Sequence, residues 1–257
     1  MRALEVLRQA DLVAAEDTRV TAKLFARYGI ATRLTAYHDH NAERVRPGLL
    51  ARLGAGGVVA LVSDAGTPLI SDPGFKLVRA AVEAGVAVTA LPGASAVLAA
   101  LVLSGLPTDR FLFAGFLDAR GERRRRTLAE LATVPASLVF FEAARRLAET
   151  LADMRDGLGD RDAAIGRELT KRFEEMRRAP LSALAAHYRD AGPPKGEVVI
   201  VVGAPLPTAA EEVNFDQWLR TALKTKGIRE AATEVAVALG LPRRTVYARA
   251  LELAQTE

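Results

Sequence analysis

Short apolar runs alternate with amphipathic stretches along the first part of this chain. Runs rich in valine, alanine and leucine predict strands, whereas apolar positions that recur every three or four residues predict helices. The predicted strands are residues 12–15, 32–36, 58–62 and 87–90. The predicted helices are residues 2–9, 18–28, 43–53, 74–84 and 94–103, and Pro47 either kinks the third of them or marks a late start. Strands separated by helices of this length predict βαβ units and a mostly parallel sheet, which is an α/β fold.

The dipeptide Leu106-Pro107 predicts a boundary, after which a second α/β pattern begins. Its strands are expected at residues 111–115, 137–141, 163–168 and 198–202, and its helices at residues 123–131, 147–156 and 182–188. From about residue 211 three helices are expected, and the last two, 229–239 and 243–253, flank a tight Gly240-Leu241-Pro242 turn, as in a helix-turn-helix. The predicted domains are residues 1–107 and 108–205, two α/β lobes, and residues 206–257, a helical module.

The residue types that are missing narrow the function classes. The 257 residues include no cysteine, which excludes disulfides, thiolate metal sites and a cysteine nucleophile. No apolar run is long enough for a membrane helix, and no signal peptide opens the sequence, so no membrane partner and a cytoplasmic location are expected.

Positive charge is clustered. The net charge of +4 permits an anionic partner, and four arginines follow one another at residues 123–126. Between residues 217 and 249, seven cations face only Glu230 and Glu234. Charge alone leaves a nucleic-acid surface and a solvated helix face open, but arginines on the second helix of a helix-turn-helix pair favour nucleic acid. The candidate RNA contacts are Arg123, Arg124, Arg125, Arg126, Lys224, Lys226, Arg229, Arg243, Arg244 and Arg249.

Polar loops follow several predicted strands. One capping residue would explain Asp17 or Thr18, but it would not explain the whole group Glu16-Asp17-Thr18-Arg19. Residues 63–72 contain two Ser-Asp pairs, and residues 91–95 form a Leu-Pro-Gly-Ala-Ser turn into a helix. Because the carboxyl ends of parallel strands meet at one edge of a sheet, these loops predict a small-molecule pocket there.

The segment Tyr37-His38-Asp39-His40-Asn41 raises the question of a metal. Two histidines around an aspartate suit metal ligation, but no further cluster has ligand spacing, so hydrogen-bonding or phosphate-contacting roles are favoured and no metal is predicted. His187 is interpreted as structural. The sequence contains neither a G-x-G-x-x-G nor a Walker loop, which argues against a classical dinucleotide or P-loop site.

Nine motifs, in order, carry a family resemblance. They are AEDTR (15–19), YHDHN (37–41), VALVSDAGTPLISDPG (59–74), LPGASAV (91–97), SGLP (104–107), RFLFAGFL (110–117), FFEA (140–143), RELTKRFEE (167–175) and KGEVVIVVG (195–203). Together they resemble the ribosomal RNA small subunit methyltransferase I family of the tetrapyrrole methylase superfamily, over nearly the whole chain.

The resemblance implies a function and a set of binding residues. It implies S-adenosylmethionine as methyl donor, held between two α/β lobes, and a decoding-region cytidine of 16S rRNA in the small ribosomal subunit as acceptor, methylated on its ribose 2′-hydroxyl. It also implies a homodimer and a C-terminal helical module that holds the RNA. The positions that match the family's cofactor pocket are Asp64, Ala65, Gly66, Leu69, Ile70, Pro92, Gly93, Ala94, Ser95, Glu142, Glu168, Gly196 and Glu197.

The acceptor side of the reaction needs a group that takes the hydroxyl proton and groups that hold the substrate. The candidates are Glu16, Asp17, Arg19, His38 and His40. The other readings that stay open are a superfamily methyltransferase acting on a tetrapyrrole or another small molecule, and an inactive RNA-binding protein.

The chain departs from the family pattern at two places. Ala144-Arg145 stands where the family usually has Pro-His, so a catalytic histidine is not expected there. The family begins with a strand and a Thr-Pro-Ile-Gly-Asn loop, whereas Met1 here opens a helix. The expectation is a sheet short of its first strand because of a wrongly chosen start codon.

Overall fold

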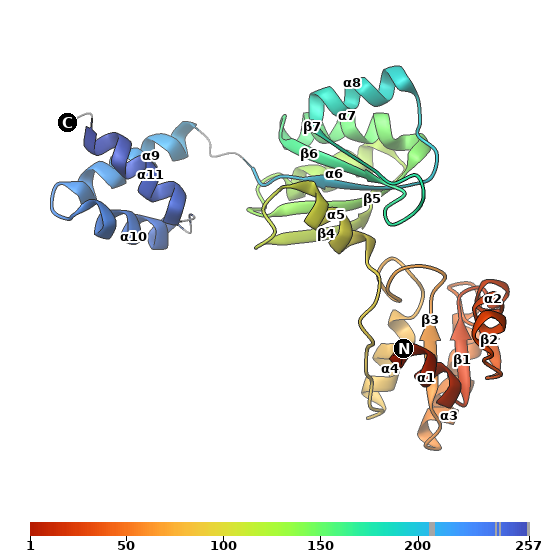
Figure 1. Ribbon diagram of the computed structural model, residues 1–257. Coiled ribbons are helices and arrows are strands. Elements are labelled where there is room, and N and C mark those ends of the chain that lie inside the picture. Colours follow the sequence, from red (N-terminus) through yellow and green to blue (C-terminus); the bar gives the residue numbers. More distant parts are fainter. Residues whose placement is uncertain (206–208, 240, 242, 256–257) are drawn as a thin grey trace. The chain divides into compact units, whose positions relative to one another are not determined.

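The computed structural model describes residues 1–205, 209–239, 241 and 243–255, without the side chains of residues 209–214 and 255. It divides into two compact units, Met1–Ala204 and Pro205–Glu257. The first unit holds two sheets, each with its own helices, and the described part of the second is helical (Figure 1). None of the described helices is long and apolar enough to cross a membrane.

The first sheet is parallel, as predicted, with the order β2-β1-β3. Its central strand alternates its side chains between two apolar clusters. Val13 joins the cluster under α1 and α2, whereas Leu12 and Ala14 join the cluster under α3 and α4. The strands are β1 (Leu12–Ala15), β2 (Leu34–Ala36) and β3 (Val59–Val62). The helices are α1 (Arg2–Gln9), α2 (Thr18–Tyr28), α3 (Ala42–Gly54) and α4 (Phe75–Glu83).

Local signals set several of these helix ends. Asp17 caps α2 by accepting from the Arg19 backbone N–H, and Gly29 ends the helix in the left-handed region at φ +59°. Pro47 lies inside α3, which begins at Ala42, so of the two expectations for this proline the late start is wrong.

The strand expected at residues 87–90 does not form. Residues 86–95 make no ladder with any described strand, and Val88 is exposed. A strand is held by the hydrogen bonds of a neighbour, and the order β2-β1-β3 leaves β3 with a partner on one side only. An apolar β-branched sequence alone is therefore insufficient here.

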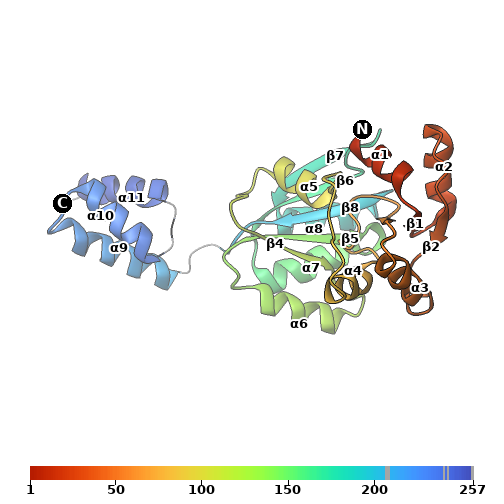
Figure 2. The ribbon, with the colours of Figure 1, turned by 90° about the horizontal axis from the view of Figure 1, so that it is seen from below.

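The second sheet is mixed, with the order β4-β5-β8-β6-β7. Helices α6, α7 and α8 share an apolar cluster with one face of the sheet, and α5 covers the other face (Figures 1 and 2). Thus α5 packs on this sheet although it precedes Leu106-Pro107. The strands are β4 (Phe111–Phe116), β5 (Ser137–Ala143), β6 (Asp162–Arg167), β7 (Glu175–Pro180) and β8 (Glu197–Val202). The helices are α5 (Ala96–Ser104), α6 (Gly121–Leu131), the 3-10 turn η1 (Ala144–Arg146), α7 (Leu147–Leu158) and α8 (Leu181–Ala191).

The edge strand β7 was not expected from the sequence. Its residues EMRRAP are mostly polar and lack the apolar alternation of a half-buried strand. Charged residues and proline are typical of edge strands, where they discourage pairing with other chains. Its pairing with β6, from Arg167↔Glu175 to Asp162↔Pro180, shows that the ladder itself holds this strand.

The second unit has its own apolar core. Apolar faces of its last two helices meet there: Ala232, Val235 and Ala236 pack against Val246 and Ala250. Leu239 is 37% exposed. The helices are α9 (Ala209–Leu223), α10 (Ile228–Leu239) and α11 (Arg243–Gln255). In the turn between the last two, Gly240 and Pro242 lie outside the described residues.

Candidate active site

The carboxyl ends of β1 and β3 bring three predicted acidic residues together. The backbone N–H of Asp17 donates to Asp64 Oδ1 over 3.3 Å, and the backbone N–H of Asp64 donates to Glu16 Oε2, also over 3.3 Å. Each of these two hydrogen bonds joins residues that are 47 or more positions apart in sequence. The parallel register, in which Ala15 faces Val62, places them side by side. The expected convergence of strand-end loops is therefore present for the loops after β1 and β3, whereas the strand expected before residues 91–95 does not form.

Arg19 neutralises one of these carboxylates. Its Nη2 lies 2.7 Å from Asp17 Oδ2, and its backbone N–H donates to Asp17 Oδ1 over 2.8 Å. These hydrogen bonds from Arg19 lower the pKa of Asp17 to about 2. Such a weakly basic carboxylate is a poor proton acceptor near neutral pH. The geometry therefore suits Asp17 to capping α2 and orienting Arg19 rather than to acting as a base.

The segment at residues 37–41 forms a compact turn after β2. Tyr37 is almost fully buried, and Asn41 Oδ1 accepts from the His38 backbone N–H over 2.9 Å. The His38 and His40 rings meet edge-on at 6.0 Å, and His40 is exposed. His38 Nδ1 is buried without a hydrogen-bond partner among the described residues. Tyr37 and Asn41 thus hold the turn, while the His40 ring is open to solvent.

The loop after β3 is held in a strained conformation. Leu69 and Ser71 have positive φ angles of 74° and 64°, which non-glycine residues rarely adopt. Gly74 has φ +135°, and a Cβ there would lie 2.6 Å from Leu61 Cδ2. Thr67 Oγ1 donates over 2.9 Å to a carbonyl of the loop at residues 92–95, that of Ala94. Strain of this kind persists only where surrounding contacts enforce it, and it is concentrated at ligand-binding segments.

The predicted cofactor residues of the two loops that Thr67 joins lie at residues 64–70 and 92–95. Most of them are exposed, whereas Leu69 and Ser95 are half-buried. Ser95 also caps α5 by accepting from the Leu98 backbone N–H. The exposed members in the two loops are Asp64, Ala65, Gly66, Ile70, Pro92, Gly93 and Ala94.

Asp72 is a further candidate residue that was not predicted from the sequence. Burial raises the pKa of its carboxyl, and the nearby charge of Asp64 acts in the same direction, while a hydrogen bond from Ser63 opposes both. The signal in the sequence was the second Ser-Asp pair. The loop thus carries two carboxyls with different environments, exposed at Asp64 and partly buried at Asp72.

The second sheet presents its own predicted residues along one edge. The Glu197 backbone N–H donates to Glu168 Oε1 over 2.9 Å, and Lys171 Nζ lies 2.9 Å from a carboxylate oxygen of each. The Lys171 hydrogen bond is the main reason that the pKa of Glu168 is lowered. Glu168 has φ +49°, and a Cβ on Gly196 would lie only 2.5 Å from the Glu168 carboxyl group. Glu168, Gly196 and Glu197 therefore form one tightly fitted cluster.

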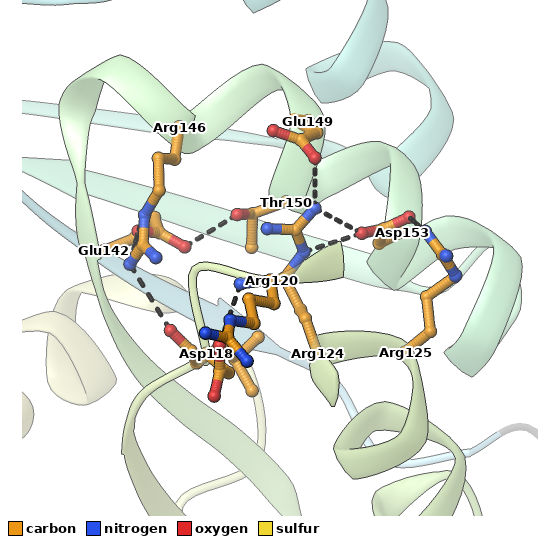
Figure 3. Close-up of polar contacts among 10 residues, drawn as sticks. Asp118, Arg120, Arg124, Arg125, Glu142, Arg146, Glu149, Thr150 and Asp153 are labelled. Carbon is orange, nitrogen blue, oxygen red and sulfur yellow. Dashed lines mark hydrogen bonds and ion pairs between the residues drawn. The ribbon is translucent and has the colours of Figure 1, made fainter. Parts of the chain in front are cut away.

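Glu142, at the end of β5, has a different environment. Its carboxylate accepts from Thr150 Oγ1 over 2.6 Å, from Arg146 Nε over 2.8 Å and from the Ala143 backbone N–H over 2.6 Å (Figure 3). The side chain is 1% exposed. Since its oxygens are already engaged within the same lobe, its geometry is that of a positioning residue that holds Arg146.

The four consecutive arginines do not share one environment. Arg124 is fully buried and ion-paired with Glu149 at 2.6 Å and with Asp153 at 2.5 Å (Figure 3). Its expected role as an RNA contact is therefore wrong, because α6 turns this position towards α7. The other three are exposed and paired more loosely: Arg123 with Asp118 at 3.6 Å, Arg125 with Asp153 at 3.5 Å and Arg126 with Glu130 at 3.4 Å.

The predicted cations of the second unit are mostly exposed. Lys224, Arg229, Arg243 and Arg244 are exposed, whereas Lys226 pairs with Glu234. Arg249 joins α11 to α9 through two hydrogen bonds to Asp216 (2.9 and 2.6 Å), which raise its pKa. Arg249 is thus part of the packing of this unit.

Two family descriptions match the chain. Tetrapyrrole (Corrin/Porphyrin) Methylases matches residues 1–185, and the RsmI C-terminal HTH domain matches residues 209–254. Together with the two-sheet fold and the strained loop after β3, the first match defines a methyltransferase of the tetrapyrrole methylase class.

Relatives narrow this class. A protein called ribosomal RNA small subunit methyltransferase I from Mesorhizobium japonicum is 52% identical to this chain, over 100% of this chain and 87% of that protein. One from Erythrobacter litoralis is 50% identical, over 98% of this chain and 89% of that protein. One from Pseudomonas aeruginosa is 44% identical, over 98% and 91%. The chain belongs to the ribosomal RNA small subunit methyltransferase I family.

Solved structures agree on the fold. A diphthine synthase superposes with a TM-score of 0.59 at 18% identity, over 79% of this chain and 83% of that one. Uroporphyrin-III C-methyl transferase from Thermus thermophilus, complexed with S-adenyl homocysteine, superposes with a TM-score of 0.51 at 22% identity, over 79% and 89%. At these identities the likeness concerns the fold alone.

Proposed function

We propose that this chain transfers a methyl group from S-adenosylmethionine to the ribose 2′-hydroxyl of a decoding-region cytidine in 16S rRNA of the small ribosomal subunit. The observation that carries the proposal is the joining of Glu16, Asp17 and Asp64 beside the strained loop after β3. The names of the relatives supply the RNA substrate. The homodimer implied by the resemblance and the cytoplasmic location expected from the sequence stay predictions.

The residues at the ends of β1 and β3 fit a cationic, hydroxyl-rich cofactor. Asp64 presents an exposed carboxylate that can accept from an amino group or from ribose hydroxyls. Thr67 ties the loop after β3 to the loop at residues 92–95, so both walls are held in place before binding. When bound, S-adenosylmethionine supplies an electrophilic methyl group on a sulfonium.

The acceptor side requires a group that takes the hydroxyl proton. The Arg19 contact lowers the pKa of Asp17 to about 2, so Asp17 is a poor proton acceptor near neutral pH. Glu16 and the two imidazoles, His38 and His40, remain the proposed proton acceptors or substrate-positioning groups. We assign Arg19 to holding an anionic part of the RNA close to Asp17, because its exposed guanidinium is fixed on one side only.

A small-molecule substrate is the alternative that the fold neighbours suggest. A uroporphyrin methyltransferase has the same fold, which in this class therefore also serves tetrapyrroles. The second unit favours RNA, since it adds a helix-turn-helix with four exposed cations at Lys224, Arg229, Arg243 and Arg244. A small substrate has no need of such a surface.

The test is transfer of a labelled methyl group from S-adenosylmethionine to small ribosomal subunits that lack the modification, with uroporphyrinogen as the competing acceptor. A 2′-O-methyl group removes the nucleophile of alkaline cleavage, so the label should appear in an alkali-resistant dinucleotide containing cytidine. Asp64→Asn should abolish cofactor binding, whereas Asp109→Asn, at an exposed position outside the site, should not. Label in uroporphyrinogen alone, or in neither acceptor, would reject the proposal.

A further inference from the structure

One edge of the second sheet collects the ends of all five strands, including the amino end of β7, which is antiparallel to β6. β4 is parallel to β5, and both β5 and β6 are antiparallel to β8, which lies between them. The carboxyl ends of β4, β5 and β6 therefore lie at the same edge as the amino end of β8. The loops that leave this edge include residues 117–120, 144–146 and 192–196.

The acidic side chains that begin these loops already have partners. Glu142 is held by Arg146 and Thr150. Asp118 accepts from the Arg120 backbone N–H over 2.8 Å and lies 3.6 Å from Arg123 (Figure 3). The two other carboxylates, Glu168 and Glu197, share Lys171. Negative charge at this edge is therefore largely balanced.

Four cations at the same edge are left over. Arg172, in the loop between β6 and β7, is exposed and lies with its Cζ 5.5 Å from the centre of the Phe173 ring. The other three lie beside consecutive strands. Arg120, Arg145 and Lys195 are exposed, and none of them forms an ion pair with another residue within 1–205. Their backbones are nevertheless fixed. The Arg120 N–H is bound by Asp118, and the Lys195 carbonyl accepts from Arg167 Nη1 over 3.3 Å.

The contrast between the adjacent residues Arg145 and Arg146 explains why Arg145 lies at the surface. Arg146 turns inward, with its guanidinium on the buried Glu142 and 3.4 Å from the Leu117 carbonyl (Figure 3). Arg145 precedes it in the same turn η1 and is exposed. The inward contact of Arg146 thus anchors η1 and ties it to the loop after β4, which leaves Arg145 at the surface.

We propose that Arg120, Arg145 and Lys195, here called the edge cations, bind successive phosphates of a single RNA strand. The inference rests on the proposed function, and it adds an RNA surface on the methylase unit to the one expected on the helical unit. The edge cations follow β4, β5 and precede β8, which are consecutive in the sheet, and neighbouring strands lie ~4.8 Å apart. Three exposed cations without an ion-pair partner among residues 1–205, one beside each of three consecutive strands, match the repeated charge of a polyanion better than the single carboxylate of a cofactor.

The experiment compares two variants that each remove three positive charges. The test variant is R120Q/R145Q/K195Q. The matched control is R79Q/R155Q/R189Q, whose arginines each pair with a neighbouring carboxylate in the same unit. Binding of a labelled single-stranded RNA with the decoding-region sequence is followed against salt concentration, and S-adenosylmethionine affinity is measured by calorimetry.

Loss of three phosphate contacts should lower the slope of log K against log salt by about 2 and weaken binding on the order of 100-fold at 0.1 M salt. The control should keep the wild-type slope, and both variants should keep the wild-type cofactor affinity and unfolding temperature. A test variant with the control's slope would overturn the inference, and so would a loss of cofactor affinity, which would assign the edge cations to the cofactor. If the wild type methylates small subunits while the test variant binds RNA normally, only this inference fails. If the wild type methylates no RNA, the proposed function itself fails.

Discussion

Replacing Arg124 with methionine should destabilise the first unit far more than the same change at Arg126. Arg124 is fully buried, and its partner Asp153 has a side chain that is only 13% exposed. Removing one member of a buried ion pair leaves the other charge uncompensated and costs about 3–5 kcal/mol. The second partner, Glu149, is 66% exposed and loses little, so we expect a cost of about 3 kcal/mol.

The measurement is thermal and denaturant unfolding followed by circular dichroism. For a unit of this size, about 3 kcal/mol corresponds to a fall in Tm of roughly 6–12 °C. The single tryptophan, Trp218, lies in the second unit, so its fluorescence reports separately whether that unit is affected. Arg126→Met should cost less than about 0.5 kcal/mol, because its pair with Glu130 is an exposed i,i+4 contact.

A second variant separates charge from packing. In R124M/D153L both buried charges are gone, and hydrophobic replacement of a buried pair is often close to neutral, so stability should return to within about 1 kcal/mol of the wild type. RNA affinity should be unchanged in Arg124→Met, since this side chain does not reach the surface. The reasoning is refuted if Arg124→Met is no more destabilising than Arg126→Met, or if it weakens RNA binding while stability is unchanged.

Three further outcomes are expected. Asp17 should titrate near pH 2 in the wild type and nearer pH 4 in Arg19→Gln, as measured by NMR of the carboxyl carbon. Because folding lowers the pKa of Asp17, the stability that this carboxylate contributes is present above about pH 4 and is lost as the pH falls towards 2. An unshifted pKa of Asp17 in the wild type would contradict the contact with Arg19. Gly196→Ala should destabilise the protein more than Gly192→Ala in urea unfolding. Both glycines have positive φ angles, but only a Cβ at Gly196 meets a neighbouring carboxyl group, at 2.5 Å. Equal losses of stability in the two variants would argue against that close fit. Thr67→Val should weaken S-adenosylmethionine binding several-fold in calorimetry while costing at most about 1 kcal/mol of stability. The reason is that the change removes one exposed hydrogen bond between the two proposed cofactor-binding loops. An unchanged affinity would show that this hydrogen bond does not preorganise the loops.

Most local elements were predictable because their signals lie in neighbouring residues. The strand at residues 12–15 and the helix at residues 18–28 have the expected bounds, since an apolar run, an aspartate cap and a terminal glycine all lie within the segment. The two errors at strands have the opposite cause. Residues 87–90 look like a strand but have no partner, and β7 looks like a loop but is held by its ladder with β6. Strand formation depends on a distant neighbour that a local pattern does not contain.

The candidate site was predictable in composition but not in geometry. The convergence of Glu16 and Asp64 follows from strand-end loops on a parallel sheet, which the βαβ pattern implies. That Asp17 is committed to Arg19, and that Asp72 is partly buried, depends on distances and burial that no spacing encodes. The same holds for Glu142, whose partners at Arg146 and Thr150 become visible only once β5 and α7 are packed together.

The sequence by itself determined the class of fold, the helix-turn-helix pattern, the polar loop at residues 63–72 as part of a predicted small-molecule pocket, and the family. It did so because periodicity, capping residues and motifs are written in short stretches of chain. Only the tertiary structure decided which of four consecutive arginines is buried, and that β8 enters between β5 and β6 and so brings loops from distant parts of the chain to one edge. Burial and strand order arise from contacts between residues far apart in sequence, so the roles of Arg124 and of the edge cations depend on the assembled sheet.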